Sequence, residues 1–154
     1  MEQIGTVMDL KGTRGRLLGV DFGDARTGLS LSDASRFLSS GIGYVSPGGI
    51  EKTAEHVAGV AREKGVSGVV VGLPRNMDGS EGFRADRCRE FAALLASRLD
   101  GVPVVMIDER MTTMSASRYL NETGTRGQKR KGVIDTLSAQ IILQNALDKL
   151  KNMG

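Results

Sequence analysis

Three short segments with strand-like patterns come first along the chain. Residues 17–22 form an apolar run, residues 29–32 alternate between apolar and polar side chains, and residues 37–45 form a third segment that two glycines weaken. Only short connections separate these segments. Because strands joined by a short turn pair antiparallel, the pattern predicts an antiparallel meander of three strands.

The rest of the chain alternates between helical periodicity and unbroken apolar runs. Two apolar runs predict buried strands, at residues 66–71 and 102–107. Helical spacing of apolar side chains predicts four helices, at residues 50–64, 81–99, 113–121 and 134–151. Buried strands separated by helices are typical of parallel pairing through right-handed crossovers. The predicted fold is therefore α/β, a mixed five-stranded sheet that combines the antiparallel meander with parallel strands and has helices on both faces.

The length of 154 residues suits a single domain that buries a core without disulfides or structural metal. Residues 1–15 contain three glycines and show no clear period, so we expect a flexible leader there and one domain over residues 16–152. Aromatic residues make up only 4% of the chain, and most of the phenylalanines, Phe83 included, are expected in the core.

The polar features of the sequence predict a cytoplasmic protein without a membrane partner. Cys88 is the only cysteine, which excludes an intramolecular disulfide and fits a reducing compartment. The first residues lack a signal-peptide pattern, and no apolar run has the length of a membrane span. The net charge of +3 permits a phosphate-bearing partner without requiring one.

Three acidic residues are predicted to converge at one edge of the sheet. Asp21 ends the first strand and Glu109 follows the last one, and the carboxyl ends of parallel strands meet at one edge. On a helical projection, Asp135 points in the same direction as the apolar side chains of the last helix. A buried carboxylate requires a cation or hydrogen-bond donors, so Asp135 is expected to face this edge too.

Three carboxylates favour a hard divalent cation, Mg²⁺ or Mn²⁺. His56 is the only histidine and Cys88 the only cysteine, which excludes a His/Cys zinc site. A Ser-His-Asp triad would have to use His56, and nothing near it resembles a nucleophile elbow. Each acid also has an ordinary structural explanation: a turn for Asp21, an ion pair with Arg110 for Glu109, and a favourable first helical turn for Asp135. Their convergence favours metal binding and the activation of water.

Four motifs in order carry a family resemblance. They are Gly19-Val20-Asp21-Phe22-Gly23 with Arg26, Gly28 and Ser32-Asp33; Gly72-Leu73-Pro74 with Asn76-Met77-Asp78-Gly79-Ser80; Asp108-Glu109-Arg110-Met111-Thr112-Thr113; and Lys131 through Ile134-Asp135 to Ile141-Ile142-Leu143. The pattern resembles the YqgF/RuvX family of RNase H-like proteins. The resemblance implies an RNase H-like fold, matches Asp21, Glu109 and Asp135 to the family's acids, and implies an endonuclease that processes the 5′ end of precursor 16S rRNA during ribosome biogenesis.

Further residues receive roles beside this resemblance. The predicted substrate contacts, mostly to backbone phosphates, come from Arg26, Arg75, Asn76, Arg110 and Lys131. Proteins with an RNase H-like site often use a fourth carboxylate, and Asp24 and Asp108 are both candidates. The ribosomal particle and a second copy of the chain are candidate partners beside the nucleic acid.

Three alternatives stay open at this point. The same chemistry suits branched DNA, as in a Holliday junction resolvase-like nuclease. A non-catalytic assembly factor that binds nucleic acid is a second alternative, in which the acids are structural. A nucleotide-binding ATPase is the third, because residues 19–28 also resemble the first phosphate loop of actin-like folds, although those proteins need two such domains around one nucleotide.

Overall fold

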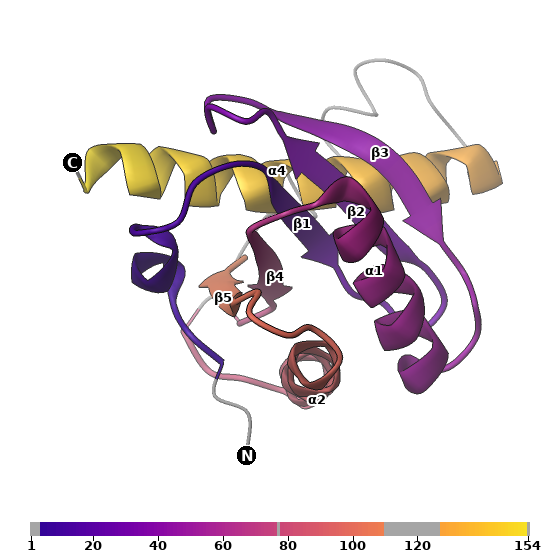
Figure 1. Cartoon of the computed structure of the whole chain (residues 1–154). Helices are drawn as coiled ribbons and strands as arrows, with labels where there is room; N and C mark the ends of the chain where they lie inside the picture. The colour runs from indigo at the N-terminus through magenta and orange to yellow at the C-terminus, as the bar shows by residue number, and fades with distance from the viewer. Residues whose placement is uncertain (1–3, 77, 110–126, 154) are drawn as a thin grey trace.

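A computed structural model describes residues 4–76, 78–109 and 127–153, apart from the side chains of 127–131. Its sheet has five strands in the order β3-β2-β1-β4-β5 (Figure 1). The strands are β1 (Leu17–Asp21), β2 (Thr27–Ser32), β3 (Ser39–Val45), β4 (Gly68–Leu73) and β5 (Val104–Asp108). The helices are η1 (Val7–Leu10, a 3₁₀ turn), α1 (Ile50–Lys64), α2 (Phe83–Ser97) and α4 (Gly127–Asn152). No described helix has both the length and the apolarity needed to span a membrane.

The strand pairing confirms the mixed sheet. β1 pairs antiparallel with β2, and β2 pairs antiparallel with β3. β1 pairs parallel with β4, and β4 pairs parallel with β5. The three parallel strands therefore end at one edge of the sheet, as the alternation of helices and apolar runs predicted.

Helices cover both faces of the sheet (Figure 1). On one face, α1 and α2 bury a core that includes Val20, Val57 and Phe91. The rings of Phe22 and Phe91 stack with centroids 4.5 Å apart, which fixes α2 beside the end of β1. On the other face, α4 and η1 pack against β1, β4 and β5 around Ile142 and other apolar side chains.

Small residues allow α4 to lie close to its face of the sheet. A Cβ atom on Gly19 would lie 2.7 Å from Leu143 Cβ and 2.9 Å from the carbonyl oxygen of Ala139. The hydroxyl of Ser30 on β2 donates a hydrogen bond to that same carbonyl at 2.7 Å. Larger side chains at these positions would push the helix away from the strand ends.

Three expectations require correction or qualification. Residues 4–15 are not a loose leader: Val7 and Leu10 are buried, and the carbonyl oxygen of Gly5 accepts a hydrogen bond from the amide of Met106. Phe83 is 72% exposed because it begins α2 on the side away from the sheet, and Phe37 is 60% exposed. α4 begins seven residues earlier than predicted, and the helix predicted at 113–121 lies outside the described residues.

Candidate active site at the carboxyl edge of the sheet

Asp21 lies at the end of the central strand and faces α4. Along β1, Leu17 packs with the α4 cluster, whereas Leu18 and Val20 pack with the α1–α2 cluster. Because side chains alternate along a strand, Gly19 and Asp21 share the face of Leu17. Asp21 is only 8% exposed, so its carboxylate lies at the edge of the core rather than in solvent.

Gly72 on β4 creates the space that Glu109 occupies. The register places Val20 beside Val71, so Gly72 is the neighbour of Asp21 on this side. A Cβ atom on Gly72 would lie 3.0 Å from Glu109 Cδ and 2.5 Å from Ile142 Cδ1. The backbone amide of Glu109 donates a hydrogen bond to the carbonyl oxygen of Leu73 at 3.1 Å, which holds the residue in line beyond β5.

Gly28 on β2, on the other side of Asp21, creates the space that the backbone of Asp135 occupies. Gly28 and Asp21 are direct partners in the antiparallel register. A Cβ atom on Gly28 would overlap the backbone carbonyl of Asp135. Two glycines therefore flank Asp21, and each makes room for a segment that carries another acid.

The three predicted acids are close enough to act on one another electrostatically. Burial raises the pKa of Asp21 well above its usual value, and the charges of Glu109 and Asp135 raise it further. Burial raises the pKa of Glu109 to about 7, and Asp108 contributes to that rise. Burial also raises the pKa of Asp135, against the hydrogen bond from Arg26 that lowers it. The described structure therefore gathers negative charge that its own groups neutralise only in part.

Arg26 is the direct partner of Asp135. Its Nε donates to Asp135 Oδ2 at 2.7 Å, and both side chains are partly buried. One of the predicted phosphate-binding residues therefore contacts a predicted metal ligand. A cation that binds Asp135 Oδ2 would either share that oxygen with Arg26 or displace it.

Arg84 is a functional candidate that the sequence analysis missed. It lies in the first turn of α2, four residues before Cys88, and thus on the same side of the helix. Cys88 Sγ lies 4.0 Å from the carbonyl oxygen of Phe22, the residue after Asp21. This contact places Arg84 one helical turn beyond Phe22, beside the end of β1.

The charge of Arg84 is directed toward the acids. It lowers the pKa of Asp21, Glu109 and Asp135, and it has no hydrogen-bond or ion-pair partner among the described residues. Its side chain is exposed, so it remains available to a ligand. No pattern in the sequence singles out Arg84, because its position depends on how α2 packs against β1.

The other predicted substrate contacts have mixed outcomes. Arg75 forms ion pairs with Glu81 at 3.3 Å and with Asp108 at 3.8 Å. The side-chain amide of Asn76 donates to Ser80 Oγ at 2.9 Å, so Asn76 closes the turn after β4. Arg110 lies outside the described residues, as does the side chain of Lys131.

The two candidates for a fourth carboxylate differ in their surroundings. The side chain of Asp24 is 62% exposed and pairs with Arg87 at 2.8 Å. Asp108 directly precedes Glu109 and raises the pKa of that residue. Of the two candidates, Asp108 is the one whose charge raises the pKa of Glu109.

The donor chemistry of this site fits a hard divalent cation. The acids offer only oxygen, and Glu109 Oε2 is buried without a hydrogen-bond partner in the described structure. With the side chains as placed, no three acidic, histidine or cysteine side chains of the described residues are close enough to hold an ion. The fit therefore requires the acidic side chains to lie closer together than they do in this arrangement. Cys88 adds no ligand, since burial raises the pKa of its thiol to about 12.

The raised pKa values predict an unusual dependence of stability on pH. Folded Glu109 binds its proton up to about pH 7, whereas its usual pKa is 4.5, so the folded state holds more protons between these values. The free energy of unfolding of the metal-free protein should therefore fall as the pH rises through this window. Thermal unfolding in chelator should show the midpoint dropping by several degrees, at about 2–4 °C per kcal/mol.

Divalent cations supply the complementary measurement. Because ligands must be deprotonated, Mg²⁺ or Mn²⁺ should raise the midpoint more at about pH 8 than at about pH 5. The variant that combines Asp21→Asn with Glu109→Gln should lose most of both effects. A midpoint that rises with pH in chelator would contradict the electrostatic account of the site.

Sequence relatives of this chain carry a consistent name. The model of the RuvX family, described as Holliday junction resolvase, matches residues 15–149. A protein of Pelotomaculum thermopropionicum is 42% identical over 134 residues, which cover 86% of each chain. A protein of Nocardioides sp. is 44% identical over 140 residues, covering 89% of this chain and 90% of its own. Both are named "Putative pre-16S rRNA nuclease".

Solved structures support the RNase H-like fold. Thermus thermophilus RuvC in complex with a Holliday junction aligns with a TM-score of 0.57 at 16% identity, covering 91% of this chain and 98% of RuvC. A second T. thermophilus RuvC structure aligns with a TM-score of 0.53 at 15% identity. This likeness concerns the arrangement of strands and helices.

Proposed function

Because this chain belongs to the RuvX family, we propose that it is a metal-dependent endonuclease that processes the 5′ end of precursor 16S rRNA in the cytoplasm. The names of its relatives supply the substrate. The observation that carries the chemistry is the group formed by Asp21, Glu109 and Asp135 at the carboxyl edge of the sheet, each with a raised pKa. The ribosomal particle that contains the precursor is the natural setting for this reaction.

In the proposed reaction on a phosphodiester, the acids hold the cation and the nearby arginines bind the phosphate. Asp21, Glu109 and Asp135 would hold the divalent cation, which when bound supplies Lewis-acid stabilisation of the charge that develops on the phosphate. The anionic substrate cannot approach three bare carboxylates without positive charge beside them. Arg26 and Arg84 supply that charge from two sides, from the β1–β2 loop and from the first turn of α2.

Arg26 has two partners available in this scheme. Its guanidinium donates to the carboxylate of Asp135 and neutralises its charge. If Asp135 held a cation, Arg26 at the rim of the site would be able to donate to a phosphate oxygen. Arg26 thus holds Asp135 in place before the reaction and contacts the substrate during it.

Replacing Arg84 with alanine should weaken substrate binding. Arg84 contacts the phosphate through charge and has no structural partner among the described residues, so the fold should remain intact. We expect KM to rise about tenfold and the slope of log K against log salt to fall by about 0.7 to 0.9, the loss of one phosphate contact. The acidic limb of the pH–rate profile should move to higher pH, because Arg84 lowers the pKa of all three acids.

Lys64→Ala provides the matched control. Lys64 is an exposed cation in the last turn of α1, which covers the same face of the sheet as α2. Lys64→Ala should leave the pH–rate profile unchanged. It should lower the slope of log K against log salt by less than the value for one phosphate contact. A pH–rate profile of Arg84→Ala that coincides with wild type would remove Arg84 from the site.

The activity itself is tested with two substrates in parallel. Purified protein is incubated with a precursor 16S rRNA fragment that spans the mature 5′ end and with a four-way DNA junction, each with Mg²⁺, Mn²⁺ or chelator. We expect cleavage of the RNA at discrete positions only when a divalent cation is present. Cleavage of the junction alone would replace the RNA by branched DNA, the second candidate that the RuvC-like fold favours.

A non-catalytic assembly factor would give a different pattern. The wild-type protein would then bind the precursor and leave it intact under every metal condition. That outcome would overturn the nuclease proposal, and the acids would be assigned to the structure of the sheet edge.

A further inference from the structure

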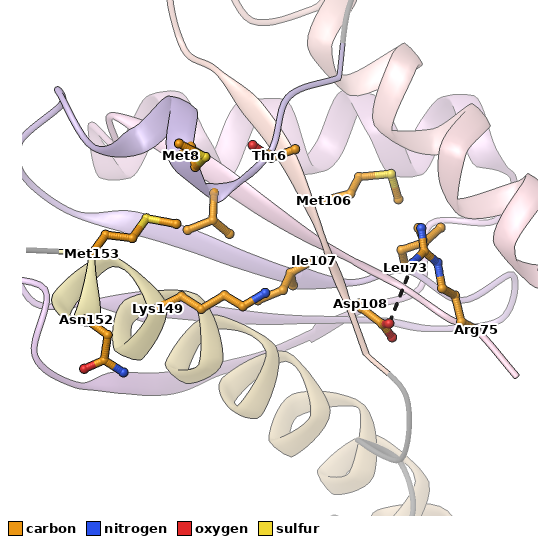
Figure 2. Close-up of a pocket in the computed structure, with 11 residues that line it drawn as sticks. Thr6, Met8, Leu73, Arg75, Met106, Ile107, Asp108, Lys149, Asn152 and Met153 are labelled. Carbon is orange, nitrogen blue, oxygen red and sulfur yellow. Dashed lines mark ion pairs between the residues drawn. The ribbon is translucent and has the colours of Figure 1, made fainter. Parts of the chain in front are cut away.

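A cavity of about 620 Å³ lies beside the candidate active site, at the outer edge of β5. Thr6 and Met8 from the N-terminal segment form one wall, Leu73 and Arg75 from the end of β4 form another, and the last turns of α4 complete it (Figure 2). Its size is that of a small-molecule site. Asp21, Glu109 and Asp135 do not line it, whereas Arg75, a predicted substrate contact, and Asp108, a candidate fourth carboxylate, do.

The apolar surface of the cavity is rich in methionine. Met8, Met106 and Met153 come from three separate segments and all line the cavity, with Met8 and Met153 near each other and Met106 apart from them (Figure 2). Met8 is 66% exposed, so its side chain is accessible to a ligand in the cavity. Methionine is flexible and polarisable, and its sulfur makes favourable contacts with aromatic rings. This surface suits a flat ring.

The charged groups of the cavity are two cations, Arg75 and Lys149, and one carboxylate, Asp108, which pairs with Arg75. Lys149, from the last turns of α4, has no side-chain hydrogen bond or ion pair with any described residue. Arg75 Nε is buried and lacks an acceptor within the described structure, although the other guanidinium nitrogens pair with Glu81 and Asp108. Asn152 adds an amide that can both donate and accept. A ligand here should carry negative charge together with hydrogen-bonding edges.

The cavity is also at a suitable place for the substrate strand. Asp108 lines it and directly precedes Glu109 in the chain. Ile142 packs over Gly72 next to Glu109, and Lys149 lies seven residues further along α4, about 10 Å away. A nucleotide adjoining a phosphate at the acids could therefore reach the cavity.

We propose that this cavity binds one unpaired nucleotide of the substrate strand, with its base among Met8, Met106 and Met153 and its phosphate at Lys149. The proposal rests on the proposed nuclease function and adds a substrate requirement. Because a base enters the cavity only when it is free of its pairing partner, the strand must be single-stranded next to the cleaved bond. A peptide with apolar side chains would bring no negative charge to Lys149, so it suits the cavity less well.

The test measures binding in an Asp21→Asn background, where cleavage does not interfere. Single-stranded RNA oligonucleotides carry one abasic residue that is moved along the strand. We expect a loss of affinity of about three- to tenfold at one position, the size of a sulfur–ring contact. Adding Met153→Ala should abolish the penalty at that position alone.

The phosphate contact has its own variant. Lys149→Gln should weaken binding about fivefold and lower the salt slope by about 0.7. Lys151→Gln is the matched control, because it removes the same charge two residues away, where Nζ lies 5.7 Å from the Phe37 ring and outside the cavity. Free AMP, added as competitor, distinguishes a site for any mononucleotide from one that requires the strand.

Each outcome decides between the proposals. An abasic penalty that persists in Met153→Ala, or equal effects of the Lys149 and Lys151 substitutions, overturns the nucleotide site even when the wild-type protein cleaves RNA. The requirement for an unpaired base is overturned if a fully paired duplex binds tightly and the Lys149 and Met153 substitutions weaken that binding as much as they weaken binding of single-stranded RNA. Failure of the wild-type protein to cleave while the abasic pattern holds overturns the nuclease function and leaves the nucleotide site standing.

Discussion

Replacing Asp21 with asparagine should abolish cleavage of the precursor RNA while RNA binding persists. Asp21 is the central acid, flanked by the glycines that make room for Glu109 and Asp135. In the proposed site Asp21 would be a ligand of the cation, so the loss of its charge should remove several kcal/mol of transition-state stabilisation. We expect the single-turnover rate to fall at least about 1,000-fold, equivalent to about 4 kcal/mol.

The same variant should be more stable than wild type in the absence of metal. Burial and two like charges raise the pKa of Asp21, so ionised Asp21 destabilises the fold at neutral pH. Thermal unfolding in chelator checks this expectation. Asp86→Asn, which alters an exposed acid on α2, is the control and should change neither rate nor stability appreciably. Cleavage by Asp21→Asn at a near wild-type rate would exclude the three-acid site.

Replacing Gly28 with alanine should cause the largest loss of stability among single small substitutions near the site. The added Cβ would overlap the carbonyl of Asp135, which belongs to the backbone of α4 and cannot rotate away. Overpacking of this kind typically destabilises a protein by about 1–3 kcal/mol. Because the strain falls on the turn that carries Asp135, cleavage should decrease even at temperatures where the variant is folded.

Gly59→Ala provides a matched control. Gly59 lies within α1, and a Cβ atom there would meet nothing within 4 Å. The same chemical change should raise stability by up to about 1 kcal/mol, because alanine is the better helix former. Denaturant unfolding of the two variants should therefore shift in opposite directions. A Gly28→Ala variant as stable and active as wild type would show that α4 does not need its close approach.

Periodicity and strand order predicted most of the fold. Helix α1 occupies the predicted residues 50–64, where its apolar side chains face the core and Gly65, with φ 62°, accepts the left-handed turn that ends it. The antiparallel meander and the parallel strands also agree with the pattern. Patterns of this kind depend on neighbours along the chain, and they specify the element that each segment forms.

Exposure at the ends of elements was less predictable. Phe83 is a large apolar residue at helical spacing from Phe91 in the sequence, yet it is 72% exposed. The segment 4–15 has no period, yet η1 buries Val7 and Leu10 against β5 and α4. In both cases burial depends on what the rest of the fold places beside the residue.

Patterns along the chain were enough to predict that Asp21 and Glu109 lie at the ends of strands, where the structure places them. The same patterns also predicted the face of the last helix on which Asp135 lies, because helical periodicity relates that residue to its apolar neighbours. The distances between these groups depend on the tertiary structure, in which Gly28 and Gly72 make room for Asp135 and Glu109. The tertiary structure also determines which arginines lie beside the acids. Arg84 and the Arg26–Asp135 pair arise from the packing of α2 and α4 on the sheet, which brings together residues far apart along the chain. Contacts of that kind depend on the close approach of whole elements, so no local pattern encodes them.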